Sequence, residues 1–389
     1  MAEMLQNLQN ALVYLGAFVL VLSVVVFVHE FGHFRIGRWC GIAVKSFSIG
    51  LGSEWFGWTD KHGTRWKVSR IPLGGFVSWI DDSDGTSTLP ASPEHQALSD
   101  EEARQRGHFR AQQLWKRAIT VAAGPLTNFV FAIVAFAILA LVMGRDAPRI
   151  DQVQPGQPAS EAGLLPGDVV QTVDGRVVRD FAALQGLIAT SPGQTLSFVV
   201  RRGDVVVTVP VTPRPHPDNE QVGMIGVMHD SSMANREPIP PHAALAEGAS
   251  ATWAILSQTT TYLANVVTGR ESGAQIAGPL GILNVSGQVA SSALEAPEAT
   301  WSQKALFLTL SLLQLAAVLS VAVGFVNLLP IPILDGGHLL FYGIEALRGG
   351  KPIPPAAQEW AYRAGFAVMA SLFLFATWND ITRLFPGAH

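Results

Sequence analysis

The amino-acid sequence predicts a polytopic α-helical membrane protein with four transmembrane helices, a membrane-associated β-hairpin region and one inserted α/β domain. Composition is the first reason: of the 389 residues, 49% are hydrophobic and only 14% are charged, whereas soluble domains have about 25% charged residues. The second reason is four long runs with almost no charge, each close to the roughly 20 apolar residues that cross a bilayer as a helix. The third is a polar stretch with alternating strand patterns between the second and third runs.

The first apolar run, from about Ala11 to Val28, lies in an N-terminal segment of residues 1–34 that ends in HEFGHF. A cleaved signal peptide has a basic start and a small-residue cleavage site. This chain starts MAEMLQNLQN and continues from the apolar run directly into HEFGHF. We therefore expect the segment to stay in the protein as the first transmembrane helix.

Residues 35–117 are predicted to form a cytoplasmic-side loop and β-hairpin region. The stretch KVSRIPLGGFVSW alternates in polarity and contains Pro72, Gly74 and Gly75, which indicates a hairpin with an exposed edge. Lys and Arg are frequent in this region and absent from residues 1–34, and positively charged loops stay in the cytoplasm. The first helix is therefore expected to end in the cytoplasm, with the N-terminus outside.

The second transmembrane helix is predicted at residues 118–143, and residues 150–213 are predicted to form an extracytoplasmic domain. This domain has a helical stretch near Phe181 and two alternating strands joined by the turn residues Gly203 and Asp204. In AGLLPGD followed by DG it resembles a PDZ domain of the bacterial protease type. PDZ domains bind an extended peptide as an added strand and catch a C-terminal carboxylate in a backbone nest.

The PDZ resemblance implies a peptide-binding role for four residues of the AGLLPGD stretch: Gly163, Leu164, Leu165 and Gly167. The expected ligand is an extended peptide or a protein C-terminus. The alternative is that the domain is only a steric plug that screens out bulky substrates.

Residues 214–304 are predicted to form a linker and a membrane-surface amphipathic helix. Gly248 to Gly269 carries no charge but is rich in Ser, Thr, Gln and Asn, so we expect it to lie on the membrane surface rather than to cross. The third transmembrane helix is predicted within residues 305–340 and the fourth within residues 361–384. Four crossings put both termini and the inserted domain on the outer side.

His29, Glu30 and His33 form the pattern H-E-x-x-H at the end of the first apolar run. Helix positions four apart lie on one face and can share a metal, and Glu30 beside them can deprotonate a water. Polar groups at membrane depth are costly unless they are paired, solvated or metal-bound. Interfacial polar residues at a helix end are the alternative, but these need no four-residue register. The pattern therefore predicts a zinc site.

A catalytic zinc usually takes three protein ligands and keeps one position open for water. No Glu or His follows His33 in the next helix turns, and the best third candidate is Asp335, the one carboxylate in GFVNLLPIPILDGGHLL. Pro330 and Pro332 interrupt the helix just before it, which lets the chain bend and point a carboxylate inward. An ordinary helix cap or turn residue is the alternative role for Asp335. The neighbouring His338 is not needed to complete the site.

Three motifs together resemble the site-2 protease family of intramembrane zinc metalloproteases, peptidase family M50: HEFGH in the first helix, AGPLTN in the second and NLLPIPILDGGH in the third. Among these proteases the chain is most similar to the bacterial regulator-of-sigma-E protease type. The resemblance covers nearly the whole chain, although the best-known relatives have two PDZ domains and one is visible here. It implies a multi-pass protein of the bacterial inner membrane, with both termini and the PDZ domain in the periplasm.

The resemblance also implies roles for individual residues. Glu30 is the general base beside one Zn²⁺ ion, and Asn327 holds the substrate backbone or the developing oxyanion. An Asn inside a span, such as Asn327 or Asn128, can instead bridge helices. The implied ligands of the zinc are His29, His33 and Asp335.

In the family, a loop like the predicted hairpin holds the substrate as an added strand. This implies that Gly74, Gly75 and Phe76 bind substrate. The alternative is an ordinary solvated hairpin.

The implied activity is hydrolysis of peptide bonds in single-pass membrane proteins, for example an anti-sigma factor or a leftover signal peptide, by Glu30-assisted attack of zinc-bound water. The transmembrane helices are expected to contact membrane lipid. A non-catalytic PDZ membrane scaffold is one alternative, and it leaves HEFGH and LDGG without a purpose. A metal transporter or sensor is another, but it needs further intramembrane acidic or His groups, which the second and fourth predicted spans do not supply.

The composition of the chain argues against a nucleic-acid partner and against structures that need several cysteines. The net charge of −4, without a long basic run, predicts no nucleic-acid partner. A single cysteine, Cys40, excludes an internal disulfide and a cysteine-rich metal cluster.

Overall fold

The computed structural model describes residues 2–81, 98–217, 219–230, 236–295 and 299–384, and divides into two compact units. Unit 1 comprises Met1–Ala137 and Glu247–His389, and unit 2 comprises Ile138–Ala246. Among the described residues, four helices are long and apolar enough to cross a membrane: Gln9–Trp39, Leu114–Met143, Trp301–Asn327 and Pro355–Arg383. The four predicted transmembrane helices are therefore confirmed by length and composition.

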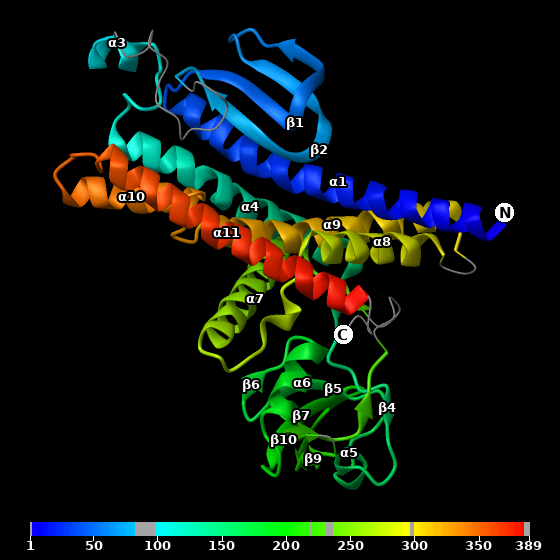
Figure 1. Ribbon diagram of the computed structural model, residues 1–389. Coiled ribbons are helices and arrows are strands. Elements are labelled where there is room, and N and C mark those ends of the chain that lie inside the picture. The colour runs from blue at the N-terminus through cyan, green and yellow to red at the C-terminus, as the bar shows by residue number, and fades with distance from the viewer. Residues whose placement is uncertain (1, 82–97, 218, 231–235, 296–298, 385–389) are drawn as a thin grey trace. The chain divides into compact units, whose positions relative to one another are not determined.

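The spanning segments belong to four long helices of unit 1 (Figure 1): α1 (Ala2–Trp39), α4 (Leu114–Met143), α9 (Trp301–Asn327) and α11 (Pro355–Leu384). Small residues bring α9 close to its neighbours. Ala316 is buried against Val21 and Val25 of α1, and Ala317 is buried against Ala132 of α4. Small side chains let helix backbones approach closely, which is the usual basis of packing between helices in lipid.

Strands β1 (Val44–Thr59) and β2 (Arg65–Trp79) form an antiparallel pair beside α1. The turn lies between the strands, where the Asp60 carboxylate accepts hydrogen bonds from the backbone N–H groups of His62 and Thr64.

The first half of β1 is paired on both sides. Ser48 pairs with Lys67 in one half of β2 and with Phe76 in the other, so this part of β1 lies between two halves of the same strand. The side chain of Phe47, in this part of β1, is fully buried in a cluster with Phe34 of α1. The hairpin is therefore fixed to the helix that contains HEFGH.

A break separates α9 from α10 (Asp335–Leu347), as the two prolines predicted. Gly336 and Gly337 begin α10 so close to the preceding loop that a Cβ on either would overlap its backbone carbonyls. At the other end of α10, Glu345 forms an ion pair with Arg117 of α4. Both ends of α10 are thus held in place.

The two α-helices directly before α9 in the chain are α7 (Pro241–Val267) and α8 (Pro279–Leu294). The first contains most of the polar segment Gly248 to Gly269 and is not among the described helices apolar enough to span. The second was not predicted, because its many Ser and Gly residues resemble a linker. It packs on α1, where a Cβ at Gly287 would overlap the Tyr14 ring.

The start of α8 is held by the last helix of the chain. Asp380 of α11 is 1% exposed, and its carboxylate accepts hydrogen bonds from the N–H groups of Gly278 (3.0 Å) and Gly281 (2.8 Å). A carboxylate at this position satisfies donors that a helix start otherwise leaves free and suits the positive end of the helix dipole.

Unit 2 contains a four-stranded antiparallel sheet in the order β6-β5-β7-β8 with two helices (Figure 1): β5 (Val169–Val173), β6 (Arg176–Val177), β7 (Leu196–Arg202), β8 (Val205–Val211), α5 (Pro158–Glu161) and α6 (Phe181–Ala189). Its core includes Phe198 and Val200 of β7 and Leu184 of α6, each fully buried. The helix near Phe181 and the two strands joined at Gly203 were predicted from the sequence.

The predicted boundary of this domain, residues 150–213, is too short. Strand β11 (Val227–Met228) pairs with β4 (Gln152–Val153), and β12 (Arg236–Glu237) pairs with β3 (Arg145–Asp146). In the chain between β8 and β11, β9 (Arg214–His216) pairs with β10 (Asn219–Met224). Residues predicted as a linker therefore return to close the domain, through short pairings that a local pattern does not reveal.

Candidate metal centre

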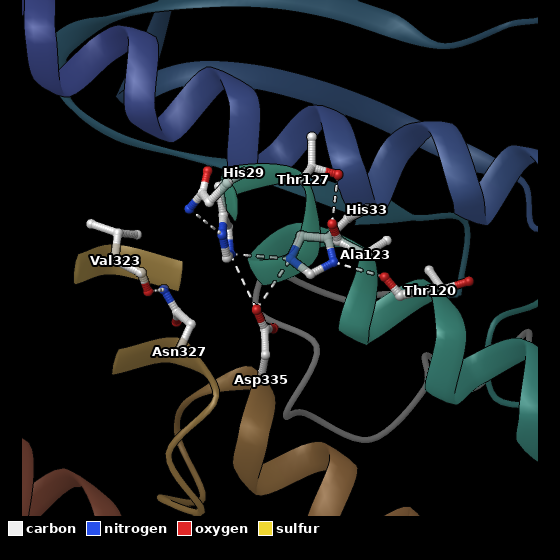
Figure 2. A network of polar contacts seen from close by, with 9 residues as sticks. His29, His33, Thr120, Ala123, Thr127, Val323, Asn327 and Asp335 are labelled. Carbon is white, nitrogen blue, oxygen red and sulfur yellow. Dashed lines mark hydrogen bonds and ion pairs between the residues drawn. The ribbon is translucent and has the colours of Figure 1, made fainter. Parts of the chain in front are cut away.

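Three predicted ligands, His29, His33 and Asp335, lie together in unit 1 (Figure 2). The Nε2 atoms of His29 and His33 are 3.2 Å apart. Oδ2 of Asp335 lies 3.1 Å from Nε2 of His29 and 3.4 Å from Nε2 of His33. One oxygen and two nitrogens thus form a nearly equilateral triangle.

The triangle has the dimensions that a tetrahedral zinc needs. Bonds of about 2.0–2.1 Å at tetrahedral angles separate two ligand atoms by roughly 3.3 Å, close to the three observed distances. Oδ2 of Asp335 is buried without a hydrogen-bond partner among the described residues, which is costly for a carboxylate unless a cation faces it. Two imidazoles and a carboxylate are ligands that zinc takes, so the site fits the metal.

Local structure explains how these three residues meet. His29 and His33 are one turn apart on α1, so both point from the same face of the helix (Figure 2). Asp335 is the first residue of α10, directly after the break at Pro330 and Pro332. The bend that the prolines impose brings the carboxylate to the histidines.

The ring nitrogen of His33 that points away from the site, Nδ1, makes a hydrogen bond that determines the tautomer of the ring. Its Nδ1 lies 2.9 Å from the backbone oxygen of Thr120, which can only accept, so Nδ1 is the protonated nitrogen and donates. The lone pair of Nε2 is then free for a metal. Such a bond orients a metal-binding histidine.

Gly124 of α4 lies directly against both imidazoles, and the sequence analysis did not identify its role. A Cβ there would overlap Nε2 of His33 and lie 2.9 Å from Cε1 of His29. On the α1 side, a Cβ at Gly32 would lie 2.5 Å from the Ala123 oxygen and from Oγ1 of Thr127. The AGPLTN motif gave a signal, since it places a glycine inside an apolar span, but only the contact between α1 and α4 gives the reason.

Glu30 lies next to the ligand group without belonging to it. A Cβ added to Gly75 of β2 would be 3.3 Å from Cγ of Glu30 and 2.9 Å from Cγ1 of Val26. The structure thus brings the predicted base and the predicted substrate-binding segment Gly74–Phe76 to the same place on α1. The missing side chain at Gly75 leaves room for this approach.

Two other residues near the site do not join the ligand group. The amide nitrogen of Asn327 donates to the Val323 backbone oxygen of its own helix at 3.0 Å (Figure 2). His338 packs its ring against Tyr362 and Phe341. The role of Asn327 in binding substrate stays a prediction.

In unit 2, the four predicted peptide-binding residues form one loop: Gly163, Leu164, Leu165 and Gly167. Leu164 is 2% exposed and its side chain belongs to the domain core, so its predicted contact with a peptide would be made by its backbone and stays a prediction. The N–H of Leu165 donates to Asp168, whose carboxylate also binds Arg202. The apolar character of GLLPGD reflects core packing at Leu164, and the part of Gly163, Leu165 and Gly167 in peptide binding stays a prediction.

Comparison with known proteins identifies relatives along nearly the whole chain. The model of peptidase family M50 matches residues 17–372. A candidate zinc metalloprotease of Rhizobium meliloti is 40% identical over 99% of this chain and 100% of its own length. The metalloprotease MmpA of Caulobacter vibrioides is 36% identical over 96% of both chains. The zinc metalloprotease RasP of Bacillus licheniformis is 30% identical over 95% of this chain and 99% of its own.

Proposed function

The chain belongs to peptidase family M50 and is a zinc metalloprotease of the site-2 type, and from this premise we propose that it hydrolyses peptide bonds of single-pass membrane proteins within or beside the bilayer. The observation that supports this most directly is the triangle of His29, His33 and Asp335. His29 and His33 lie within the apolar helix α1, and Asp335 follows the break after the apolar helix α9. A metal held there can act only on a substrate that reaches membrane depth.

The proposed chemistry assigns each residue one task. His29, His33 and Asp335 bind zinc and leave one position open. When bound, zinc polarises the scissile carbonyl and lowers the pKa of a water. Glu30, adjacent on α1 but outside the ligand group, takes the proton from that water and returns it to the leaving amine.

The hairpin is proposed to present the substrate in extended form. A helical substrate hides its amides, while a protease needs one carbonyl placed against the attacking water. The approach of Gly75 to Glu30 supports substrate binding as an added strand along Gly74, Gly75 and Phe76. Asn327 would then release Val323 and bind the substrate backbone or oxyanion.

The proposal extends to location and partners. Lys and Arg are concentrated in residues 35–117 and absent from residues 1–34, which supports an inner-membrane orientation with both termini and unit 2 in the periplasm. Unit 2 is proposed to be a PDZ domain that binds an extended peptide or a protein C-terminus. Substrates would be single-pass proteins such as anti-sigma factors or leftover signal peptides.

A Glu30→Gln variant tests this function. In the full chain, purified and mixed with a single-span reporter protein, we expect the variant to keep about one zinc per chain and to lose hydrolysis. Glu54→Gln is the matched control, because Glu54 lies in the hairpin, is paired with Arg65 and is not one of the three residues of the ligand group.

Zinc content and reporter cleavage together separate the alternatives. Normal cleavage by Glu30→Gln would show that Glu30 is not the base. A wild-type chain that binds zinc but never cleaves single-span reporters would favour a scaffold or a metal sensor instead.

A further inference from the structure

Asn128 of α4 is fully buried beside one of the predicted zinc ligands. Its amide nitrogen lies 3.2 Å from Nδ1 of His29. Its amide oxygen is buried without a hydrogen-bond partner among the described residues. A buried polar atom left without a partner is destabilising, so this orientation of the amide leaves its oxygen unsatisfied.

The chemistry of His29 decides how this contact is made. Nε2 of His29 faces His33 and Asp335, so Nε2 is the nitrogen whose lone pair can bind a metal. A neutral imidazole that uses Nε2 in this way has its proton on Nδ1. Nδ1 is then a donor, and it cannot bond to the Asn128 amide nitrogen, which is also a donor.

Turning the Asn128 amide by half a rotation resolves the conflict. The oxygen and nitrogen of an amide are nearly equal in size, and their assignment follows from the hydrogen bonds they make. After the rotation, the oxygen that lacked a partner accepts the proton of His29 Nδ1 at the same 3.2 Å separation. We propose that Asn128 is a positioning residue of the zinc centre, whose amide oxygen fixes the tautomer and ring orientation of His29.

The geometry of α4 supports this assignment independently. Thr120 binds the outer nitrogen of His33, Gly124 lies against both rings, and Asn128 lies at the outer nitrogen of His29. These three residues are spaced by four, so they share one face of α4. One face of α4 thus supplies a hydrogen-bond acceptor for each histidine. Gly124, between the two acceptors, leaves room for both imidazole rings.

The alternative role for Asn128 is a hydrogen bond that links two helices. That link uses the backbone of Asn128 and not its side chain. The backbone oxygen of Asn128 accepts a hydrogen bond from Oγ of Ser320 in α9 at 3.2 Å. The link between α4 and α9 therefore does not need the Asn128 side chain. The amide remains available for His29.

The proposal rests on the zinc site described above, and variants of the full chain in detergent test it. Asn128→Leu has a similar volume and no acceptor, whereas Asn128→Asp keeps one. We expect Asn128→Leu to weaken zinc binding by about 10–100-fold in competition with a chelator, as is typical when a group behind a ligand is lost. Asn128→Asp should bind zinc at least as tightly as wild type and shift the absorption bands of the cobalt-substituted protein. Ser320→Ala is the control, which should lower thermal stability and leave zinc affinity unchanged.

Each outcome decides one question. If Asn128→Leu binds zinc like wild type, or if Asn128→Asp loses zinc as much as Asn128→Leu, the proposed positioning role is wrong. His33→Ala is the reference for the site itself: if that variant keeps its zinc, the ligand assignment fails, whatever the Asn128 variants show. Thermal unfolding of each zinc-free variant identifies a loss of zinc that comes from misfolding alone.

Discussion

Gly124 determines whether α4 can lie against the two histidines of α1. We expect Gly124→Ala to lose bound zinc, because the new methyl group needs the space of His33 Nε2 and part of the His29 ring. Overpacking of this kind costs about 1–3 kcal/mol in a well-packed interior, and here it also displaces a ligand. Metal analysis of the purified chain gives the zinc content.

Gly343→Ala is the matched control for this substitution. Gly343 also lies inside a helix, α10, but a Cβ there meets no described atom within 4 Å. It should keep zinc and, if anything, gain helix stability. Full zinc occupancy in Gly124→Ala would mean that α1 and α4 can separate without losing the site.

The grouping of the three candidate ligands could be predicted from the sequence, but the α4 residues that contact them could not. His29 and His33 are four positions apart in one helix, so their shared face is a local property, and the prolines before Asp335 mark a bend. The contacts of Thr120, Gly124 and Asn128 depend on how α1 and α4 are aligned. They join residues 87 and 99 positions apart in the chain, a register that no local pattern contains.

At the scale of elements, His229 fastens β11 to the segment that enters unit 2. Nδ1 contacts the Arg149 backbone oxygen at 3.0 Å and the Asp151 carboxylate at 3.0 Å, and Nε2 contacts Asp146 at 2.8 Å. Phe181 of α6 stacks on the ring. Both ring nitrogens face acceptors, so this arrangement requires the protonated imidazole.

The closure of unit 2 should therefore weaken as the pH rises. Burial alone lowers the pKa of His229, but hydrogen bonds to Asp146 and Arg149, with the charges of Asp146 and Asp151, raise it above its ordinary 6.5. A raised folded-state pKa means that the stabilisation is complete below the unfolded-state pKa and is lost as pH rises through the folded-state pKa. In the full chain, the protection factors of amides in β3, β4 and β11, which compare the exchange rate with that of an unfolded chain at the same pH, should fall from pH 6.5 upward.

Two comparisons check the origin of this pH dependence. His229→Gln should exchange quickly at all pH values above 6 and show no such step. For the Asp168–Arg202 pair, stability changes with pH in the opposite direction. Burial raises the pKa of Asp168, but its hydrogen bonds to Arg202 and Leu165 and the charge of Arg202 outweigh burial and leave the pKa below 3.8. Its stabilisation is lost only as pH falls through that lowered pKa, so β7 should be unaffected near neutrality. A step of equal size in His229→Gln would rule out His229 as the cause.

Elements with a strong local pattern were predicted correctly, and those made by distant contacts were not. The four spans follow from the length of their apolar runs. Helix α8 has many small polar residues, and its start is held by Asp380 from α11. Strands β11 and β12 are two residues long and pair with partners more than seventy positions away. Their existence depends on the folded domain rather than on their own sequences.

At the scale of the whole molecule, the site constrains how the chain crosses the membrane. His29 contacts Asn128 while His33 contacts Thr120, so α1 and α4 run in opposite directions. Asp335 follows α9, and its carboxylate meets the C-terminal part of α1. The two ends can meet only if an odd number of crossings separates α1 from α9, since the hydrocarbon core is about 30 Å thick. Helix α4 supplies one crossing, so we expect no single further crossing between α4 and α9, and neither α7 nor α8 is among the described helices that are long and apolar enough to span.

Cysteine labelling tests this topology. In a Cys40→Ser background, single cysteines at Lys61, Lys351, Asp204 and Glu295 are exposed to an impermeant thiol reagent on cells with permeabilised outer membranes. We expect labelling at 204 and 295, which lie outside in the proposed orientation, and protection at 61 and 351 until the inner membrane is opened. Labelling at 204 without labelling at 295 would mean that the chain crosses once more between them, and would contradict the three-ligand site.

The hydrogen bonds of Asp380 set an order of events during synthesis. Gly278 and Gly281 leave the ribosome 102 and 99 residues before Asp380. At about 5–20 residues per second, the start of α8 waits roughly 5–20 s before its carboxylate partner exists. Until this part of α11 is made, these two N–H groups lack the carboxylate that accepts their hydrogen bonds, so the start of α8 reaches its final hydrogen bonding only near the end of synthesis. The last helix to be made thus completes the arrangement of helices that formed before it, and a chain that stops short of residue 380 lacks this final fastening.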